Sequence, residues 1–170
     1  MSIKTIAQHI NWDFEVNGNL EIRDQHGHQI YFENLHGDWT KRKYNSQGKE
    51  TFYENSHKNW YEKEYDAAGN CTYYKQYNGY WEKKEYDAQG NVIYSEKSNG
   101  PWERKEYDAQ GNEIYFQNSN GYWWKKEYDS EGNQIYFENS LEGCIEDYRP
   151  KPCENKVVEI DGIKYKLTKI

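Results

Sequence analysis

The sequence predicts an all-β protein, an antiparallel meander of tandem β-hairpin repeats that forms an extended, twisted single-layer sheet with a C-terminal hairpin. The main observation is a period of 21 residues, which five tryptophans keep without a slip: Trp39, Trp60, Trp81, Trp102 and Trp123. Glycines keep the same period: Gly27, Gly48, Gly69, Gly90, Gly111 and Gly132. A fixed period of this size is typical of repeat proteins, in which each unit packs against its neighbours and none folds alone.

Each repeat contains two strand-like runs and two turns. In residues 81–101 the runs are WEKKEYD and NVIYSEKS, which are rich in aromatic and β-branched residues. The turn from Asp87 to Asn91 predicts a three-residue loop, in which Gly90 supplies the left-handed conformation. The turn from Ser98 to Pro101 predicts a two-residue type I′ hairpin. Because no connection is long enough for a parallel crossover, we expect about a dozen antiparallel strands.

These turns fix a register, and the register assigns side chains to faces. Tyr86 should face Val92 across the first turn, and Lys97 should face Trp102 across the second. One face then carries Trp81, Lys83, Glu85, Ile93, Ser95 and Lys97. The opposite face carries Glu82, Lys84, Tyr86, Tyr94 and Glu96. We expect the tryptophan side to be the more buried one and the other side to be solvated.

The composition indicates a thin, aromatic core. Leu, Ile, Val and Phe make up only about 15% of the 170 residues, a level that normally indicates disorder. The 18 tyrosines and 7 tryptophans compensate, because each aromatic side chain buries a large area. This fits a single-layer sheet. An open sheet of this many strands tends to curl or split, so a rolled, barrel-like closure is the alternative.

The two ends of the chain differ from the repeats. Residues 1–17 are irregular and are expected to cap the first strand of a six-unit array over 18–143. A proline-interrupted linker over 144–156 follows. The last segment, 157–170, reads as a hairpin with a type I′ turn at Asp161-Gly162.

Charge and cysteine content narrow the function classes. The net charge is −7, both signs alternate within each repeat and no basic stripe is present, which argues against direct nucleic-acid binding. No signal peptide and no membrane-spanning run is recognisable. Three cysteines without a CxxC pair favour a reduced, cytoplasmic protein. The unpaired sheet edges suggest a monomer or a homodimer.

The sequence offers no catalytic constellation, so no enzymatic activity, cofactor or metal site is expected. His26 and His28 lie in a turn, but two histidines make only half of a metal site, and we interpret them as exposed turn residues. Aspartates recur at the start of the glycine turns, where a carboxylate bonds the turn backbone. A catalytic dyad needs two carboxyl groups in different environments, whereas a repeat places every copy of its aspartate in the same environment.

The tryptophan row is the best candidate for a binding surface. Tryptophan and tyrosine are favoured at interface hot spots, and repeat proteins often bind through an extended face. The candidate binding residues are Trp39, Trp60, Trp81, Trp102, Trp123, Lys83, Arg104 and Lys125. The alternative is that the tryptophans form the core of the repeat.

Some segments resemble known families. The cores EYDAQGN and EYDSEGN resemble YD/Rhs repeats, and the 21-residue aromatic hairpin is similar to MORN-type repeats. The tail VVEIDGIKYKL resembles small proteins encoded by bacteriophages and mobile elements. This last resemblance implies a counter-defence role, in which the protein blocks a host immune protein such as a CRISPR effector or a nuclease.

The sequence therefore predicts a non-enzymatic protein-binding module, in its most specific form a phage-encoded inhibitor of a bacterial defence protein. The alternative is a small-ligand binder or sponge whose aromatic slots hold a carbohydrate, choline or a nucleotide. In that case several equivalent sites are expected, because the repeats are nearly identical.

Overall fold

The computed structural model describes residues 4–141, 145–150 and 156–166. Two short helices come first, α1 (Ile6–Ile10) and α2 (Phe14–Asn17). The repeat strands follow: β1 (Leu20–Arg23), β2 (Gln29–Glu33), β3 (Trp39–Tyr44), β4 (Glu50–Asn55), β5 (Trp60–Tyr65), β6 (Cys71–Gln76), β7 (Trp81–Tyr86), β8 (Val92–Lys97), β9 (Trp102–Tyr107), β10 (Glu113–Asn118), β11 (Trp123–Tyr128) and β12 (Gln134–Asn139). Three short strands complete the chain: β13 (Ile145–Asp147), β14 (Val157–Ile160) and β15 (Ile163–Lys166).

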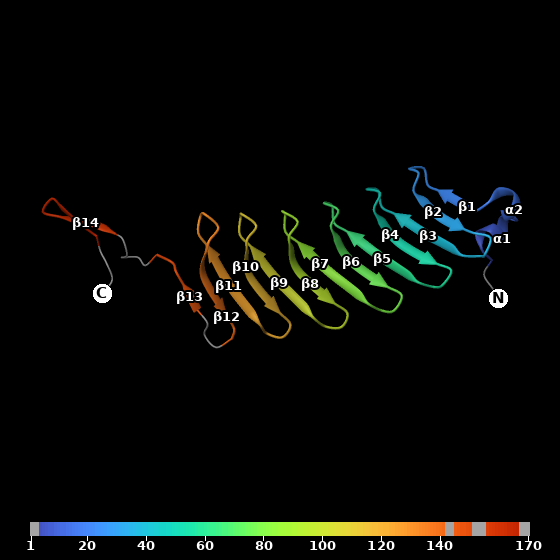
Figure 1. Ribbon diagram of the computed structural model, residues 1–170. Helices are drawn as coiled ribbons and strands as arrows, with labels where there is room; N and C mark the ends of the chain where they lie inside the picture. Colours follow the sequence, from blue (N-terminus) through green and yellow to red (C-terminus); the bar gives the residue numbers. More distant parts are fainter. Residues whose placement is uncertain (1–3, 142–144, 151–155, 167–170) are drawn as a thin grey trace. The chain divides into compact units, whose positions relative to one another are not determined.

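The predicted fold class is confirmed. Strands β1 to β13 form one antiparallel sheet whose strand order follows the chain, and β14 and β15 form a separate hairpin (Figure 1). The order runs from β1 to β13 without returning to β1, so the sheet does not close into a barrel. The chain divides into two compact units, 1–104 and 105–170, which are described separately below.

The first turn of each repeat forms as predicted. The Asp87 N–H donates to the Asn91 carbonyl at 3.0 Å, and Gly90 has a φ of 89°. The Asp87 carboxylate accepts the backbone N–H groups of Gln89 and Asn91, both at 2.9 Å, and the Asn91 side-chain amide at 3.0 Å. The Asn91 amide, followed by the backbone donors, holds the pKa of Asp87 below its usual value despite some desolvation. The aspartate is therefore a structural part of the turn.

The second turn corrects the sequence prediction. The Lys97 N–H donates to the Pro101 carbonyl at 3.0 Å, so the loop contains three residues rather than two. Gly100 has a φ of 99°, but Asn99 is not in the left-handed region, which a type I′ turn would require. Both turns of the repeat thus use the same design, a tight turn closed by one left-handed glycine.

A β-bulge in the even strands also changes the predicted register. Tyr86 pairs with Val92 as expected, but Glu85 pairs with Tyr94, so Ile93 is an extra residue that has no partner in the ladder. Trp102 pairs with Glu96 and not with Lys97, because the second turn has three residues rather than two. The same shift recurs in every described first hairpin of the array.

The bulge exchanges half of the predicted side chains between the two faces. The face that we name the tryptophan face carries, in one repeat, Trp81, Lys83, Glu85, Tyr94 and Glu96. The opposite face, named the clasp face, carries Glu82, Lys84, Tyr86, Ser95 and Lys97. The assignment of Ser95 and Lys97 to the tryptophan side, and of Tyr94 and Glu96 to the other side, was therefore wrong.

The predicted burial of the two faces is also wrong over most of the array. On β7, Lys83 and Glu85 of the tryptophan face are exposed, whereas Lys84 and Tyr86 of the clasp face are half-buried. The reason is the bulge, which moves the aromatic residues of the Ser95 position onto the clasp face. Rings stack there across strands, for example Tyr53 on Tyr61 with centroids 5.2 Å apart.

Cross-strand rows on the tryptophan face keep opposite charges next to each other. One row runs across β5 to β9 through Glu64, Tyr73, Lys83, Glu96 and Trp102. The preceding row runs across β3 to β7 through Lys43, Phe52, Glu62, Lys75 and Trp81. All three charges are inverted between the rows, so that Lys83 faces Glu96 in one row and Glu62 faces Lys75 in the other. Such pairs contribute about 0.2–1 kcal/mol each.

On the clasp face, a tyrosine hydroxyl joins each hairpin to the preceding one. Tyr65 donates to the Glu50 carbonyl at 3.0 Å, and Tyr86 donates to the Cys71 carbonyl at 2.9 Å. Tyr44 makes the same contact with the Gln29 carbonyl at 3.3 Å. Burial raises the pKa of Tyr65 and of Tyr86 above the usual value. These hydrogen bonds fix the relative position of neighbouring hairpins within the single-layer sheet.

The Tyr86→Phe substitution should lower the free energy of unfolding by about 0.5–1.5 kcal/mol, because it removes this hydrogen bond and leaves the Cys71 carbonyl unpaired on that side. Urea denaturation followed by circular dichroism measures the effect. Tyr73→Phe is the matched control, since the Tyr73 hydroxyl makes no hydrogen bond to the described part of the chain. Equal losses in the two variants would contradict a specific role of the Tyr86 hydroxyl.

The N-terminal segment packs on the tryptophan face of the first strands through Ile6, Ala7, Trp12 and Phe14, and Figure 1 shows α1 and α2 beside β1. Ala7, Leu20 and Tyr31 are buried, with 2%, 4% and 3% of their surface exposed, and they are the buried hydrophobic residues of the described chain. The side chain of Glu33 is also buried, at 2% exposure. Its carboxylate accepts the Ala7 N–H at 3.0 Å and the Tyr31 hydroxyl at 2.7 Å. Among the residues that the structure describes, the conventional core is therefore confined to this end.

The C-terminal segment contains an additional strand. β13 pairs with β12 inside the segment for which the sequence predicted a linker. The β14–β15 hairpin turns at Asp161 and Gly162, whose φ angles of 53° and 78° confirm the predicted type I′ turn. Cys144 and Cys153 lie outside the described residues.

Candidate binding face

The predicted binding residues all lie on the tryptophan face. Each of the five tryptophans is the first residue of an odd-numbered strand and is half-buried: Trp39, Trp60, Trp81, Trp102 and Trp123. The three basic candidates are exposed two positions further along their strands: Lys83, Arg104 and Lys125. Lys83 and Trp102 share one cross-strand row, with Glu96 between them.

Neighbouring side chains cover one side of most tryptophan rings. Trp81 stacks on Tyr73 and Trp102 stacks on Tyr94, with centroids 6.4 and 6.5 Å apart. The Lys41 ammonium lies 4.5 Å from the Trp39 ring centroid. The Lys125 ammonium lies 5.5 Å from the centroid of Trp123. Each tryptophan is therefore both part of the sheet's own packing and part of its surface.

In the described part of unit 1, another element covers the first copy of this surface alone. Trp39 packs against the cluster of Ala7, Leu20 and Tyr31 that α1 helps to form. Within the described residues of unit 1, no helix or strand lies over the corresponding positions of β5, β7 and β9 (Figure 1). The chain thus buries one repeat with its own N-terminal segment and leaves the following repeats open.

Two shallow hollows occupy the same repeat position on this face, two repeats apart. The first has a volume of about 260 Å³ and is lined by Ile22, Tyr31 and Lys41, with Ile6 of the N-terminal segment as a further wall. The second has a volume of about 580 Å³ and is lined by Glu64, Tyr73 and Lys83, the equivalents of those three array residues. The second hollow has no wall from another segment and is rimmed by charged groups.

In unit 2, the position of the tryptophan face next to Glu127 and Tyr136 is occupied by Arg149 of the chain itself. The Arg149 guanidinium lies 4.1 Å from the Tyr136 ring centroid and donates to the Glu127 carboxylate at 3.0 Å. It also donates to both oxygens of Asp147, at 2.9 and 3.0 Å. Arg149 was not predicted as a site residue from the sequence, because it stands next to a proline in an apparent linker.

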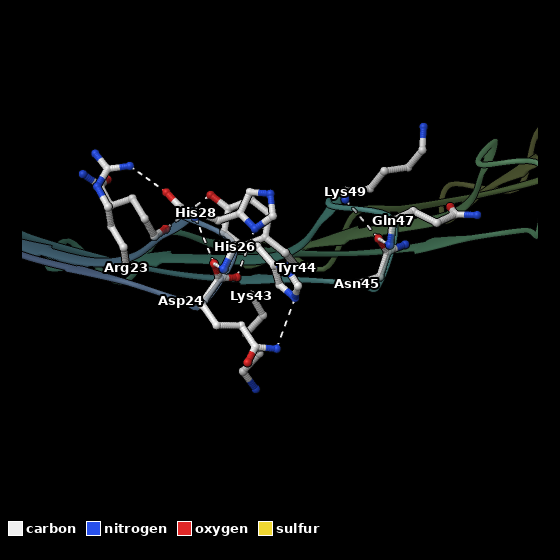
Figure 2. A network of polar contacts seen from close by, with 12 residues as sticks. Arg23, Asp24, His26, His28, Lys43, Tyr44, Asn45, Gln47 and Lys49 are labelled. Carbon is white, nitrogen blue, oxygen red and sulfur yellow. Dashed lines mark hydrogen bonds and ion pairs between the residues drawn. The ribbon is translucent and has the colours of Figure 1, made fainter.

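The histidine pair has a structural role in the first turn (Figure 2). His28 stands where four of the later repeats have asparagine, and its Nδ1 lies 3.0 Å from the Asp24 carboxylate, as the Asn91 amide does from the Asp87 carboxylate. The His28 ring stacks on Tyr44 with centroids 4.6 Å apart. Within residues 4–141, 145–150 and 156–166, no group of three or more potential metal-binding side chains comes together. The geometry supports the interpretation of His26 and His28 as turn residues.

Among the residues that the structure describes, no helix has the length and apolar character needed to cross a membrane.

Comparisons with known proteins find similarity in solved structures only. No protein-family model matches the sequence, and no curated protein matches it. The crystal structure of TcdB2-TccC3-Cdc42 is similar at 18% identity, with a TM-score of 0.49, over 70% of this chain and 7% of that chain. The Photorhabdus luminescens Tc holotoxin pore is similar at 15% identity, with a TM-score of 0.44, over 72% of this chain and 9% of that chain. This chain therefore spans less than a tenth of the solved chains that it resembles.

Proposed function

We propose that this protein is a non-enzymatic, repeat-based binding module that engages another protein through the open part of its tryptophan face. The observation that carries the proposal is the first repeat of unit 1. There the chain covers the face with its own segment 4–17, packs apolar side chains on Leu20 and Tyr31, and donates backbone N–H groups to side chains of the sheet.

The composition of the open repeats supports a protein partner. Half-buried aromatic rings alternate there with exposed charges of both signs, as in Trp81, Lys83 and Glu85. Aromatic anchors surrounded by a charged rim are the usual composition of a protein interface. The more specific form of the proposal, a phage-encoded inhibitor of a bacterial defence protein acting in the cytoplasm, rests on the resemblance of the tail.

Site-directed photocrosslinking tests the proposed function. A benzoylphenylalanine placed at Lys83 reports on the tryptophan face, and one placed at Glu103 is the matched control. Both positions are exposed, and Glu103 lies on the clasp face because it pairs with Ser95. Neither substitution removes a tryptophan, so neither disturbs the stacking that holds the sheet together.

We expect one bacterial protein to crosslink through position 83 and not through position 103. The purified partner should bind the unmodified protein saturably, and Lys83→Glu should weaken that binding by about 5-fold or more, as for a charge at an interface. Crosslinking through position 103 alone would contradict the proposal. A bound small molecule detected by native mass spectrometry, without any protein partner, would favour the small-ligand alternative.

A further inference from the structure

The repeat position occupied by Arg149 in unit 2 recurs in open form in unit 1. Register defines the equivalence: Glu127 pairs with Tyr136 in the last hairpin, and Glu64 pairs with Tyr73 three repeats earlier. In the last hairpin the ring of Tyr136 and the carboxylate of Glu127 hold the guanidinium. We call such a tyrosine–glutamate pair an arginine seat.

The Glu64–Tyr73 seat has space for a further side chain, and its two residues can make further contacts. Glu64 is exposed, and its carboxylate makes no ion pair or hydrogen bond with the described residues. The Tyr73 ring is half-buried and stacks on Trp81, which fixes its orientation. Both residues line the open hollow of about 580 Å³. Cation–π contacts and ion pairs are the two interactions that the seat can offer to an incoming group.

We propose that the Glu64–Tyr73 pair binds an arginine side chain of the partner protein, with the guanidinium over the Tyr73 ring and paired with the Glu64 carboxylate. This inference rests on the proposed function and identifies the chemistry of one contact. The net charge of −7 agrees with a basic partner segment, because opposite net charges speed association.

The neighbouring repeat positions explain why this seat differs from those before it. In the preceding hairpin the pair is Lys43 and Phe52, and the ammonium group there repels a guanidinium. In the first hairpin the pair is Ile22 and Tyr31, next to the chain's own Ile6. Carboxylate and ring return together at Glu64 and Tyr73, and again at Glu85 and Tyr94 in the next hairpin. The Glu85 carboxylate is already paired with the Lys83 ammonium at 4.0 Å, which leaves Glu64 as the carboxylate of the two that is open to an incoming arginine.

One difference from the occupied seat refines the expected partner. Asp147 pairs with Tyr136 in the last hairpin, whereas Lys83 pairs with Tyr73 in the open seat. Asp147 belongs to the segment that brings Arg149, so the incoming segment supplies its own acid. In the open seat Lys83 fills the ladder position that Asp147 has in the last hairpin, so a partner segment has to approach from above the face, where an acidic residue beside its arginine would form a second favourable charge pair with Lys83.

A peptide derived from the chain itself tests the seat. The probe is a capped peptide with the sequence of residues 145–150, IEDYRP, and its control carries citrulline, a neutral analogue of the same shape, in place of arginine. Binding to the full chain is followed by NMR, through the ring resonances of Tyr73 and Trp81. The variants are Glu64→Gln and, as matched control on the clasp face, Glu103→Gln.

We expect the arginine peptide to shift the Tyr73 resonances and to bind about 5-fold more tightly than the citrulline peptide. Glu64→Gln should weaken binding about 3- to 10-fold, and Glu103→Gln should leave it unchanged. Equal binding of the two peptides, or equal losses in the two variants, would overturn the seat. A partner that crosslinks at position 83 but binds Glu64→Gln normally would also overturn it, while leaving the proposed function intact.

Discussion

Leu20→Ala should lower the free energy of unfolding of the N-terminal unit by about 2–5 kcal/mol, the range found for a buried leucine. Leu20 is 4% exposed and forms, with Ala7 and Tyr31, the buried cluster that attaches the N-terminal segment to the sheet. Among the described residues of that unit, no second layer covers the neighbouring repeats, so no other apolar cluster there can compensate. Urea denaturation followed by aromatic circular dichroism measures the change.

Leu35→Ala is the matched control for this substitution. Leu35 lies in the turn between β2 and β3 and is 64% exposed, so the same chemical change should cost less than about 0.5 kcal/mol. Hydrogen exchange should show that Leu20→Ala exposes β1 and β2 first, because repeat arrays lose structure from a weakened end. Similar losses in the two variants would show that the N-terminal cluster does not stabilise the array.

Gly90→Ala should lower the free energy of unfolding by about 1–2 kcal/mol, the cost of forcing an L-residue into a left-handed conformation. Gly90 has a φ of 89°, and a Cβ added to it would meet no atom within 4 Å. A loss of stability in this variant cannot come from steric contact of the new methyl group. Thermal or urea denaturation therefore measures the backbone strain alone.

Gln89→Ala, one position earlier in the same loop, is the control for Gly90→Ala. Gln89 does not have a positive φ, and its substitution should change stability by less than about 0.5 kcal/mol. If Gly90→Ala were as stable as the native chain, the left-handed glycine would not be required for the turn. The period of glycines would then need another physical reason.

The interpretation of the tryptophans changes once the bulge at Ile93 is known. The sequence suggested a choice between a core and a binding surface. In the structure each tryptophan is half-buried, because it packs within a single layer against rings such as Tyr73 and Tyr94. Alanine substitution of Trp81 would therefore remove packing and surface together, which is why the binding experiments use exposed charges instead.

Some features were predictable because they depend on short segments. The spacing of Trp81 and Trp102 defined the repeat, and alternating aromatic residues defined its strands. The Asp87-to-Asn91 loop and the Asp161-Gly162 turn followed from the left-handed preference of glycine. Such conformational preferences are local, so they can be read without knowing which strands pair.

Other features appeared only when the strands were paired. Whether Ile93 pairs or bulges depends on hydrogen bonds across the ladder, and no residue in the repeat marks the bulge. Its effect is large, because a one-residue shift moves the following side chains of the same strand, from Tyr94 to Lys97, to the other face. The Glu127–Tyr136 seat likewise depends on β13 joining the sheet next to β12, which a proline-containing segment did not suggest.

The sequence by itself determined the all-β class, the repeat and the glycine turns, since backbone preference at each position is enough to specify them. The tertiary structure decided which side chains share a face, which tryptophan-face positions are covered and where an arginine is held. These features depend on the free energy of pairing between strands, which cannot be read from any single residue of the sequence.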